Sequence, residues 1–430
     1  MTRLLSLPLA AFPLIAMALP ACDSGADKQE VAVAKSSLAR VTEPQVTATD
    51  SATFAADNAA FALDAYHALV ASNGNLIFSP ASISIALAMT YAGAAGTTAT
   101  EMAEAMHFSL PPERLHPAFD ALDLALASRG EGKLGTDGGP MRLHVVNAAW
   151  AERTYAFLPE YLDILAANYG AGINLLDFVG APESARVTIN DWVADKTENR
   201  IKDLLPAGTV DSLTRLVLTN AVYFNAAWKT AFPPEDSRDA SFTTIDGSSV
   251  STRFMNGTLD DVLAVQGTGY TAVALPYADE RLSMLLLAPD PGTFAAFEAS
   301  LDVAKLDGIV AGMTSQRVIL HVPSFRIETS ADLSALLQGL GMQAAFTPGL
   351  ADFSGMDGTQ SLYVSKVLHK AFIDVAEQGT EAAAATAVVV QLTSAPSGLY
   401  INVDRPFLYF LCDEPTGAIL FMGRVMDPRQ

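Results

Sequence analysis

The chain has 430 residues, of which 50% are hydrophobic and only 17% are charged, so it can bury a large core as one domain or as two or three smaller ones. Its formal net charge of −21 argues against nucleic acid as a partner and against a polyanion such as heparin as an activator. The same charge is typical of a protein that must stay soluble.

The N-terminus has the pattern of an export signal. Arg3 precedes an apolar run over residues 4–19, which is too short to span a membrane and is typical of a secretory signal peptide. The sequence Leu-Pro-Ala-Cys22 that follows resembles the lipobox of bacterial lipoproteins. We therefore expect residues 1–22 to be a lipoprotein-type signal, Cys22 to be lipidated, and the protein to be secreted or extracytoplasmic, in the periplasm or at the cell surface. The alternative is an ordinary cleaved signal with a coincidental cysteine.

The residues after Cys22 set the domain boundary and the cysteine chemistry. Residues 23–50 are small, polar and without periodicity, which predicts a disordered tether ahead of a domain over residues 51–430. Only two cysteines occur, so lipidation of Cys22 would leave Cys412 without a disulfide partner. Cys412 ends an apolar run that starts at Pro406, which favours a buried structural thiol over a nucleophile.

The first half of the domain alternates predicted helices and loops before its first strand. Apolar residues four apart, from Phe61 to Val70, predict a helix that ends near Asn73-Gly74, and Ser79 is placed to cap a helix that starts at Pro80. The glycine-rich residues 128–140 predict a surface loop. The remaining segments are a helix stop and restart over residues 91–98, a strand over residues 141–150 and a helix over residues 159–168.

The second half contains the most apolar strands. Residues 190–206 predict a helix that leads to a turn at Pro206. Residues 216–224 are almost continuously apolar, as in a strand buried on both faces, and Asn220 within them must find hydrogen-bond partners. Further predicted elements are strands over residues 275–278, 282–288, 318–327 and 362–375 and a helix over residues 336–342.

The most informative stretch runs from Glu377 to Pro396. With a period of two, one face carries only small or β-branched neutral residues: Thr380, Ala382, Ala384, Thr386, Val388 and Val390. Exposed apolar segments of this kind are aggregation hazards, so a protein that keeps one has a use for it. The alternative is an alanine-rich helix that runs into an edge strand.

The sequence contains no motif typical of a catalytic or cofactor-binding site. The six histidines show no metal-ligand spacing, and neither Cys-x-x-Cys nor Gly-x-Ser-x-Gly occurs. We therefore expect no catalytic centre, no metal and no cofactor, and an extracellular hydrolase finds no support.

Several motifs together resemble one family. Glu377-x-Gly-Thr-Glu-Ala-Ala-Ala-Ala-Thr386 is similar to the hinge of the reactive-centre loop of serpins, the serine protease inhibitors. Further matches in the same order are Ser79-Pro-x-Ser-Ile, Asn190-x-Trp-Val, Asn220-Ala-Val-Tyr-Phe, Ala351-Asp-Phe-Ser-Gly and Asp404-Arg-Pro-Phe, and the resemblance covers about residues 54 to 428. It implies an α+β fold with three β-sheets, about nine helices, an exposed reactive-centre loop at about residues 377–396, and a monomer.

The resemblance also implies a mechanism and its residues. A target serine protease, or a cysteine protease, would attack the loop, and the cut loop would insert into the main sheet while still bound covalently to the protease. The hinge would comprise Glu377, Gly379, Thr380, Glu381, Ala382, Ala383, Ala384, Ala385 and Thr386. Counting the family's usual seventeen residues from Glu377 places the reactive bond at Thr393–Ser394, with Leu392–Thr393 as the alternative. These residues suit elastase-, subtilisin- or chymotrypsin-like proteases.

Four polar residues would form a cluster where the sheet opens. The resemblance places Ser79, Ser82, Asn220 and His369 together beneath the main sheet, with a mechanical role and not a catalytic one. The chain departs from the family where a lysine is expected to pair with Glu377, because Ser324 stands there; a pairing of Glu377 with Arg326 is left open. The alternative function is a non-inhibitory serpin that acts as a binding or chaperone protein, although the hinge lacks the bulky, charged or proline residues of such members.

Overall fold

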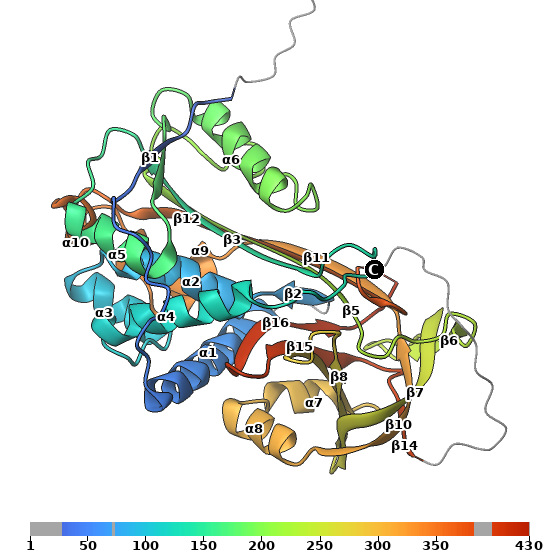
Figure 1. Ribbon diagram of the computed structural model, residues 1–430. Coiled ribbons are helices and arrows are strands. Elements are labelled where there is room, and N and C mark those ends of the chain that lie inside the picture. Colours follow the sequence, from blue (N-terminus) through green and yellow to red (C-terminus); the bar gives the residue numbers. More distant parts are fainter. Residues whose placement is uncertain (1–27, 71–73, 382–397, 430) are drawn as a thin grey trace, which may run out of the picture.

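The computed structural model describes residues 28–70, 74–381 and 398–429, which form an α+β fold (Figure 1). Several predictions fall elsewhere in the chain and lie outside the described residues. They concern the signal peptide with Cys22, residues 23–27 of the expected tether, and residues 382–397 with the expected reactive bond.

Ten α-helices lie within the described residues, close to the number expected. The first two carry recognisable start signals: the Thr47 hydroxyl accepts a hydrogen bond from the Asp50 N–H at 3.1 Å, and the Ser79 hydroxyl accepts one from the Ser82 N–H at 3.3 Å, directly before Pro80. The helices are α1 (Ala48–Leu69), α2 (Pro80–Tyr91), α3 (Gly96–Ala105), α4 (Pro112–Ala127), α5 (Pro159–Tyr169), α6 (Pro182–Lys196), α7 (Phe294–Ala299), α8 (Val303–Ala311), α9 (Ser334–Gly339) and α10 (Ser354–Asp357), with a 3₁₀ turn η1 (Ala344–Phe346).

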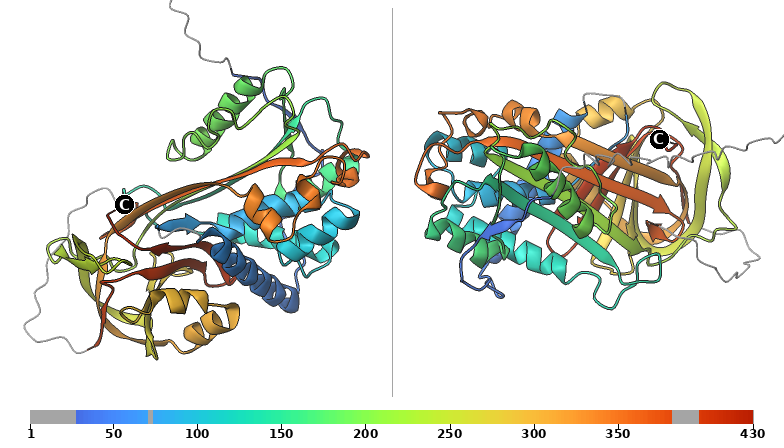
Figure 2. Two further views of the ribbon diagram at one scale, coloured as in Figure 1. Left: turned by 180° about the vertical axis from the view of Figure 1, so that it is seen from behind. Right: turned by 90° about the horizontal axis from the view of Figure 1, so that it is seen from above.

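A seven-stranded sheet forms the main layer of the molecule. Its order is β1 (Ala32–Ala34), β4 (Ile173–Leu176), β3 (Arg142–Glu152), β5 (Leu216–Ala227), β13 (Gly379–Thr380), β12 (Val364–Ala376) and β11 (Phe325–Asp332). The strands β5 and β12 also pair directly with each other and are parallel. Helix α6 covers one face of this sheet and α2 lies on the other (Figures 1 and 2).

A second, nine-stranded sheet replaces the two further sheets that were expected. Its order is β14 (Leu399–Asn402), β10 (Thr314–Pro323), β7 (Ser249–Gly267), β8 (Tyr270–Pro276), β9 (Leu282–Pro289), β15 (Phe407–Asp413), β16 (Ala418–Val425) and β2 (Leu76–Phe78), with β6 (Arg238–Thr243) paired to β7. The long strand β7 pairs with β6, β10 and β8, so it joins what would otherwise be two sheets into one.

The hydrophobic core has two parts that differ greatly in size. The larger part fills the space between the two sheets and the helices α1–α5, and it includes Phe61, Phe119 and Tyr409. The smaller part lies between α6 and the outer face of the seven-stranded sheet, around Trp150 and Ile189. Strand β5 faces both parts, which explains why its residues are nearly all apolar.

The expected tether is wrong for residues 28–50, which are ordered along the body. Ala32–Ala34 pair with Ile173–Leu175 at the edge of the seven-stranded sheet. Arg40 forms ion pairs of 2.7 Å with the buried Asp120 and with Asp123, and Ala48 already starts α1. These contacts are all to distant parts of the chain, so a local composition that predicts disorder could not reveal them.

Two other predicted elements end earlier than expected. The predicted strand over residues 318–327 is interrupted at Ser324, which separates β10 from β11 in different sheets. The predicted helix over residues 190–206 ends at Lys196. Beyond it, the Thr197 hydroxyl donates to the Val193 carbonyl at 2.8 Å and accepts from the Ile201 N–H at 3.1 Å, which turns the chain away from the helix axis.

Candidate functional site

The start of the predicted loop is already part of the seven-stranded sheet. Gly379 and Thr380 form β13, which pairs antiparallel with Val375 and Ala376 on β12 and with Ala226 and Ala227 on β5. The expectation of an exposed loop from Glu377 onward is therefore wrong for Gly379, Thr380 and Glu381, which are buried. Glycine at position 379 allows its backbone to approach β5 this closely, since a Cβ atom there would lie 2.1 Å from the Ala226 carbonyl oxygen.

Thr380 occupies a closed site beneath the sheet. Its side chain is fully buried, and its hydroxyl shares a 2.7 Å hydrogen bond with the Tyr277 hydroxyl. The Tyr277 ring stacks on Trp228 with ring centroids 4.4 Å apart, and the Trp228 indole N–H donates to the Ala376 carbonyl at 3.0 Å. Burial raises the pKa of Tyr277 well above its usual value, so the phenol stays protonated as a hydrogen-bond partner. The site fits a small residue with a hydroxyl.

Glu381 ends β13 in a conformation that a strand cannot continue. Its φ is +61°, in the left-handed region, and its carboxylate forms a 2.6 Å ion pair with the Arg200 guanidinium. Its carbonyl oxygen accepts hydrogen bonds from the Thr136 hydroxyl and from the Asn225 amide. The Glu381 N–H donates to the Asp374 carbonyl of β12. Every polar group of this residue thus contacts a neighbouring segment.

Glu377 pairs with Arg253 on β7, which answers the question that the sequence left open. The distance from Arg253 Nε to the Glu377 carboxylate is 2.7 Å. Burial acts against ionisation of Glu377, but the hydrogen bonds from Arg253, from the backbone and from Ser237, together with the Arg253 charge, outweigh it and hold the pKa of the carboxyl below its usual value. Ser324 donates a hydrogen bond to the Arg253 carbonyl at 3.3 Å, and Arg326 lies near Asp374 at 3.9 Å. Arg253 of the nine-stranded sheet thus forms the ion pair with Glu377 that was expected from a lysine at position 324.

The four polar residues predicted beneath the sheet do lie together. The His369 ring accepts a hydrogen bond from the Ser79 N–H at 3.2 Å through Nε2, and its Nδ1 contacts the Asn220 side-chain oxygen. The Asn220 amide donates to the Ser82 hydroxyl and, at 2.5 Å, to Asn147 on β3. The cluster therefore ties β12, β5 and β3 to the start of α2.

The histidine of this cluster is neutral because it is completely buried. Burial lowers the pKa of His369 to about 3. The neutral ring has one donor and one acceptor nitrogen, and both are used, so the cluster is satisfied with no ionised member. It contains no nucleophile with an activating charge, which fits a mechanical role better than a catalytic one.

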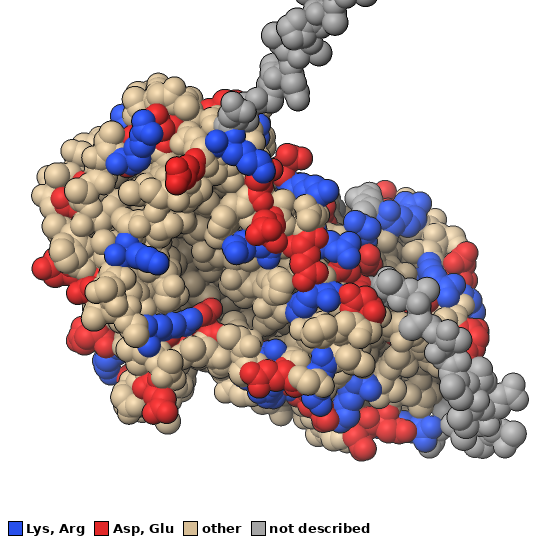
Figure 3. Space-filling model, turned by 45° about the horizontal axis from the view of Figure 1, so that its top comes forward, with Lys and Arg blue, Asp and Glu red and all other residues tan. Residues whose placement is uncertain are grey.

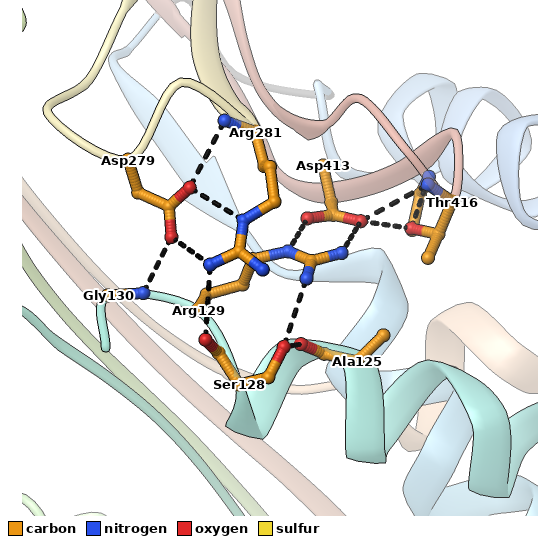
Figure 4. A network of polar contacts seen from close by, with 9 residues as sticks. Ala125, Ser128, Arg129, Gly130, Asp279, Arg281, Asp413 and Thr416 are labelled. Carbon is orange, nitrogen blue, oxygen red and sulfur yellow. Dashed lines mark hydrogen bonds and ion pairs between the residues drawn. The ribbon is translucent and has the colours of Figure 1, made fainter. Parts of the chain in front are cut away.

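A second polar network fixes the loop that carries Thr136 (Figure 4). At the end of α4, Arg129 forms a bidentate ion pair with the buried Asp413, with distances of 2.5 and 3.0 Å. Arg281 pairs with Asp279, and Asp279 also accepts the Gly130 N–H at 2.7 Å. The Gly130 end of residues 130–141 is therefore attached to the body, and Arg142 at the start of β3 pairs with Asp137 within this loop at 2.5 Å. This places the Thr136 hydroxyl against Glu381.

Neither a metal site nor a reactive thiol is found in the described part of the chain. No group of three or more His, Cys, Asp or Glu side chains there is arranged to hold a metal ion. Burial, with Glu414 and Asp413 nearby, raises the pKa of the Cys412 thiol to about 12, so it stays protonated at neutral pH. Among the helices of the described residues, none is long and apolar enough to cross a membrane. On the face shown in Figure 3, acidic and basic side chains are mixed.

Part of the predicted site lies outside the described residues, and part of the observed site was not predicted. Outside are Ala382, Ala383, Ala384, Ala385, Thr386, Leu392, Thr393, Ser394 and Cys22. Not predicted were Arg200, Arg253 and Tyr277, which reach the hinge from distant segments and carry no local signal. Asn147 could have been found, because it interrupts an apolar strand in the same way as Asn220.

Comparison with known proteins identifies the family. Residues 56–428 match the family described as Serpin (serine protease inhibitor). The chain is 39% identical to an uncharacterized serpin-like protein of Thermococcus kodakarensis, over 90% of this chain and 86% of the other. It is 37% identical to leukocyte elastase inhibitor A of Rattus norvegicus, over 85% and 97%. The crystal structure of the thermophilic serpin tengpin in the native state superposes with a TM-score of 0.81 at 26% identity, covering 93% of this chain and all of tengpin. The chain therefore belongs to the family of serpins, the serine protease inhibitors.

Proposed function

We propose that the protein is a suicide inhibitor of serine proteases, with cysteine proteases as a further target class. The observation that carries the proposal is β13: the first two small residues of the hinge already pair with both β5 and β12. The seam between these two strands thus accepts the backbone of the hinge, and the next residues, Ala382 to Thr386, are small enough to follow.

The chemistry belongs to the target protease. Its nucleophile attacks the carbonyl carbon of Thr393, the bond to Ser394 breaks, and the amine of Ser394 leaves with the C-terminal part of the loop. An ester links the protease to Thr393, or a thioester if the target is a cysteine protease. This chain supplies the bait and the insertion, and none of its own side chains acts in catalysis.

The structure suggests how insertion would stabilise the protein. Extending β13 along the seam would replace the parallel pairing of β5 with β12 by two antiparallel pairings, which are slightly more stable per residue. About a dozen new strand residues, at about 1 kcal/mol each, would contribute on the order of 10 kcal/mol. This is comparable to the whole stability of a typical domain, about 5–15 kcal/mol.

The loop sequence suggests the class of target. No lysine or arginine occurs between Lys370 and Arg405, so trypsin-like proteases are not expected targets. Threonine or leucine before the cut suits elastase-, subtilisin- or chymotrypsin-like enzymes. The name of the rat relative, an inhibitor of leukocyte elastase, agrees with the first of these classes.

The location of the protein is a further part of the proposal. A lipidated Cys22 would hold it at the outer side of a membrane, in the periplasm or at the cell surface, and Cys22 is six residues ahead of the first described residue, Lys28. Labelling of the protein with a fatty acid in the producing cell, and loss of the label in Cys22→Ser, tests this. Cleavage without labelling would indicate an ordinary signal peptide.

The experiment that tests the inhibitory function separates it from the binding alternative. The purified protein is incubated with elastase, subtilisin, chymotrypsin and trypsin and analysed on denaturing gels and by mass spectrometry. We expect a covalent complex with at least one of the first three proteases and a released peptide that begins at Ser394. Cleavage without a complex would favour a non-inhibitory serpin that binds or chaperones another molecule.

A further inference from the structure

The N-terminal segment, residues 28–47, runs along one side of the molecule and is attached to it at several points (Figure 1). At its start, the Gln29 N–H donates to the Thr188 hydroxyl of α6 at 2.7 Å. Its strand β1 pairs with β4, and beyond this strand the Ser36 hydroxyl donates to the Asp163 carboxylate of α5 at 2.5 Å. The segment therefore has an inner face fixed against α6, β4 and α5 and an outer face toward solvent.

The outer face of this segment carries a group of exposed apolar side chains. Three of the eleven exposed large hydrophobic side chains in the described part of the chain lie within nine residues here: Val33, Leu38 and Val41, which are 48%, 53% and 43% exposed. Single exposed apolar residues are common on protein surfaces, but a group of them on one segment favours contact with an apolar partner. The charges of residues 28–47 are nearly balanced, with three basic and two acidic side chains in a chain of net charge −21, so this segment lacks the negative excess that an anionic lipid surface repels.

The chain that joins this surface to Cys22 is short. Lys28, the first described residue, is six residues after Cys22, and six residues span at most about 22 Å. A lipid on Cys22 would therefore attach the protein to the membrane within this distance of Lys28. The tether expected over residues 23–50 would have reached about 100 Å and left every side of the domain equally free.

The strand order indicates how the molecule would lie on such a membrane. Because β1 is an edge strand of the seven-stranded sheet, a surface against it runs along the strands and not across their ends. The hinge strand β13 is the fifth strand from this edge, about 19 Å away at about 4.8 Å per strand. It also pairs at Ala226 and Ala227 of β5, whereas β3, the strand next to β4, pairs near Glu152 with the other end of β5, at Leu216. The hinge would therefore stay off the membrane.

We propose that Val33, Leu38 and Val41 form a membrane-contact surface that docks on the lipid bilayer holding the acyl chains of Cys22. The proposal rests on the location proposed above and adds the side of the protein that meets the lipid. Acyl chains alone leave a domain free to turn about its point of attachment, and apolar side chains that enter the headgroup region fix one orientation. In this orientation the hinge is open to proteases in solution.

The test uses the protein without its signal peptide, coupled through the Cys22 thiol to a maleimide lipid in vesicles, so it does not depend on lipidation in the cell. Cys412 does not compete, because burial raises the pKa of its thiol and keeps it protonated. Leu38→Trp is compared with Leu263→Trp, which replaces a 44% exposed residue of β7, in vesicles with and without brominated lipids that quench tryptophan on contact. We expect brominated lipids to reduce the emission added by Leu38→Trp severalfold and to leave that of Leu263→Trp unchanged, because interfacial side chains lie about 5–10 Å within the headgroup boundary.

Further substitutions separate contact from mere closeness to the anchor. Val33→Asp and Val41→Asp, added to Leu38→Trp, place two charges on the surface and should restore most of the emission. The matched control is Val310→Asp on α8, which is also 48% exposed and should leave the quenching unchanged.

Three results would overturn the proposal: no quenching of Leu38→Trp, equal quenching of Leu263→Trp, or quenching that the two aspartates do not reduce. A dimer of the uncoupled protein that the same aspartates abolish would assign the surface to a second copy of the chain instead. The location is judged separately by the fatty-acid label. Quenching of Leu38→Trp with no label in the cell would sustain the surface and reject lipidation of Cys22.

Discussion

Substitution of His369 by glutamine should flatten the dependence of stability on pH. The folded protein holds His369 neutral with a pKa of about 3, whereas the free side chain has a value near 6.5. Because the folded-state pKa is depressed, the unfolded chain binds a proton first as the pH falls below 6.5, and stability is lost from there down to about pH 3. Between pH 7.5 and 5 this loss is about 2 kcal/mol, since each pH unit below 6.5 costs about 1.36 kcal/mol.

A second buried histidine provides an internal comparison. Burial lowers the pKa of His116 to about 4, so it should contribute a further loss of about 2 kcal/mol over the same range. The unmodified protein should therefore lose about 4 kcal/mol from these two residues, and His369→Gln about 2 kcal/mol. Carboxylates with lowered pKa, such as Asp279, lose their contribution only below about pH 4 and do not disturb this window.

The assay is the first urea transition, followed by tryptophan fluorescence at several pH values between 7.5 and 5. His369→Gln should be less stable than the unmodified protein at pH 7.5, because the cluster beneath the sheet is disturbed, but its transition should move less as the pH falls. The matched control is Ser82→Ala, which damages the same cluster and keeps the histidine. An unchanged pH dependence in His369→Gln, or an equally flattened one in Ser82→Ala, would refute the reasoning.

Three substitutions test the hinge and the loop. Thr380→Arg would place an unpaired charge in the closed site beside Tyr277, so we expect cleavage by target proteases without a covalent complex; Gln378→Arg, two residues earlier, is the control and should still form complexes. Gly379→Ala would bring a Cβ atom onto the Ala226 carbonyl, and we expect faster hydrogen exchange in β13, whereas unchanged exchange would contradict the observed pairing. Thr393→Arg should create trypsin inhibition, and unchanged selectivity would rule out the assigned reactive bond.

The polar residues beneath the sheet could be singled out because their signals are local. Asn220 and His369 stand out as polar residues within apolar strands, and the family resemblance implied that they lie together with Ser79 and Ser82. The structure adds Asn147, which gives the same signal in β3. In each case the polar residue and the apolar residues around it belong to the same strand, so the sequence of that strand is enough to identify it.

The parts that could not be predicted depend on contacts between distant segments. Residues 28–50 lack periodicity, and only the buried Asp120 and the free edge of β4 explain why they are ordered. Arg253 reaches Glu377 across 124 positions of the chain, so a search confined to the neighbouring strand could not find it. The segment 197–203 was predicted to continue a helix, but it contacts distant parts of the chain: Glu198 lies near Arg142, the Lys202 carbonyl accepts from Lys370, and Arg200 pairs with Glu381.

The arrangement of the seven-stranded sheet explains why it would open between β5 and β12. Strand β11 pairs antiparallel with β12 and is also joined to it by two ion pairs of 2.7 Å, Lys370–Glu328 and Lys366–Asp332. On the other side, β3 pairs antiparallel with β5 over ten residues. The pairing of β5 with β12 is shorter and parallel, has a shift in register near Val364, and lies over the polar cluster. The two antiparallel pairs can therefore separate as intact units, and the weaker pairing between them is the one that the hinge has already entered.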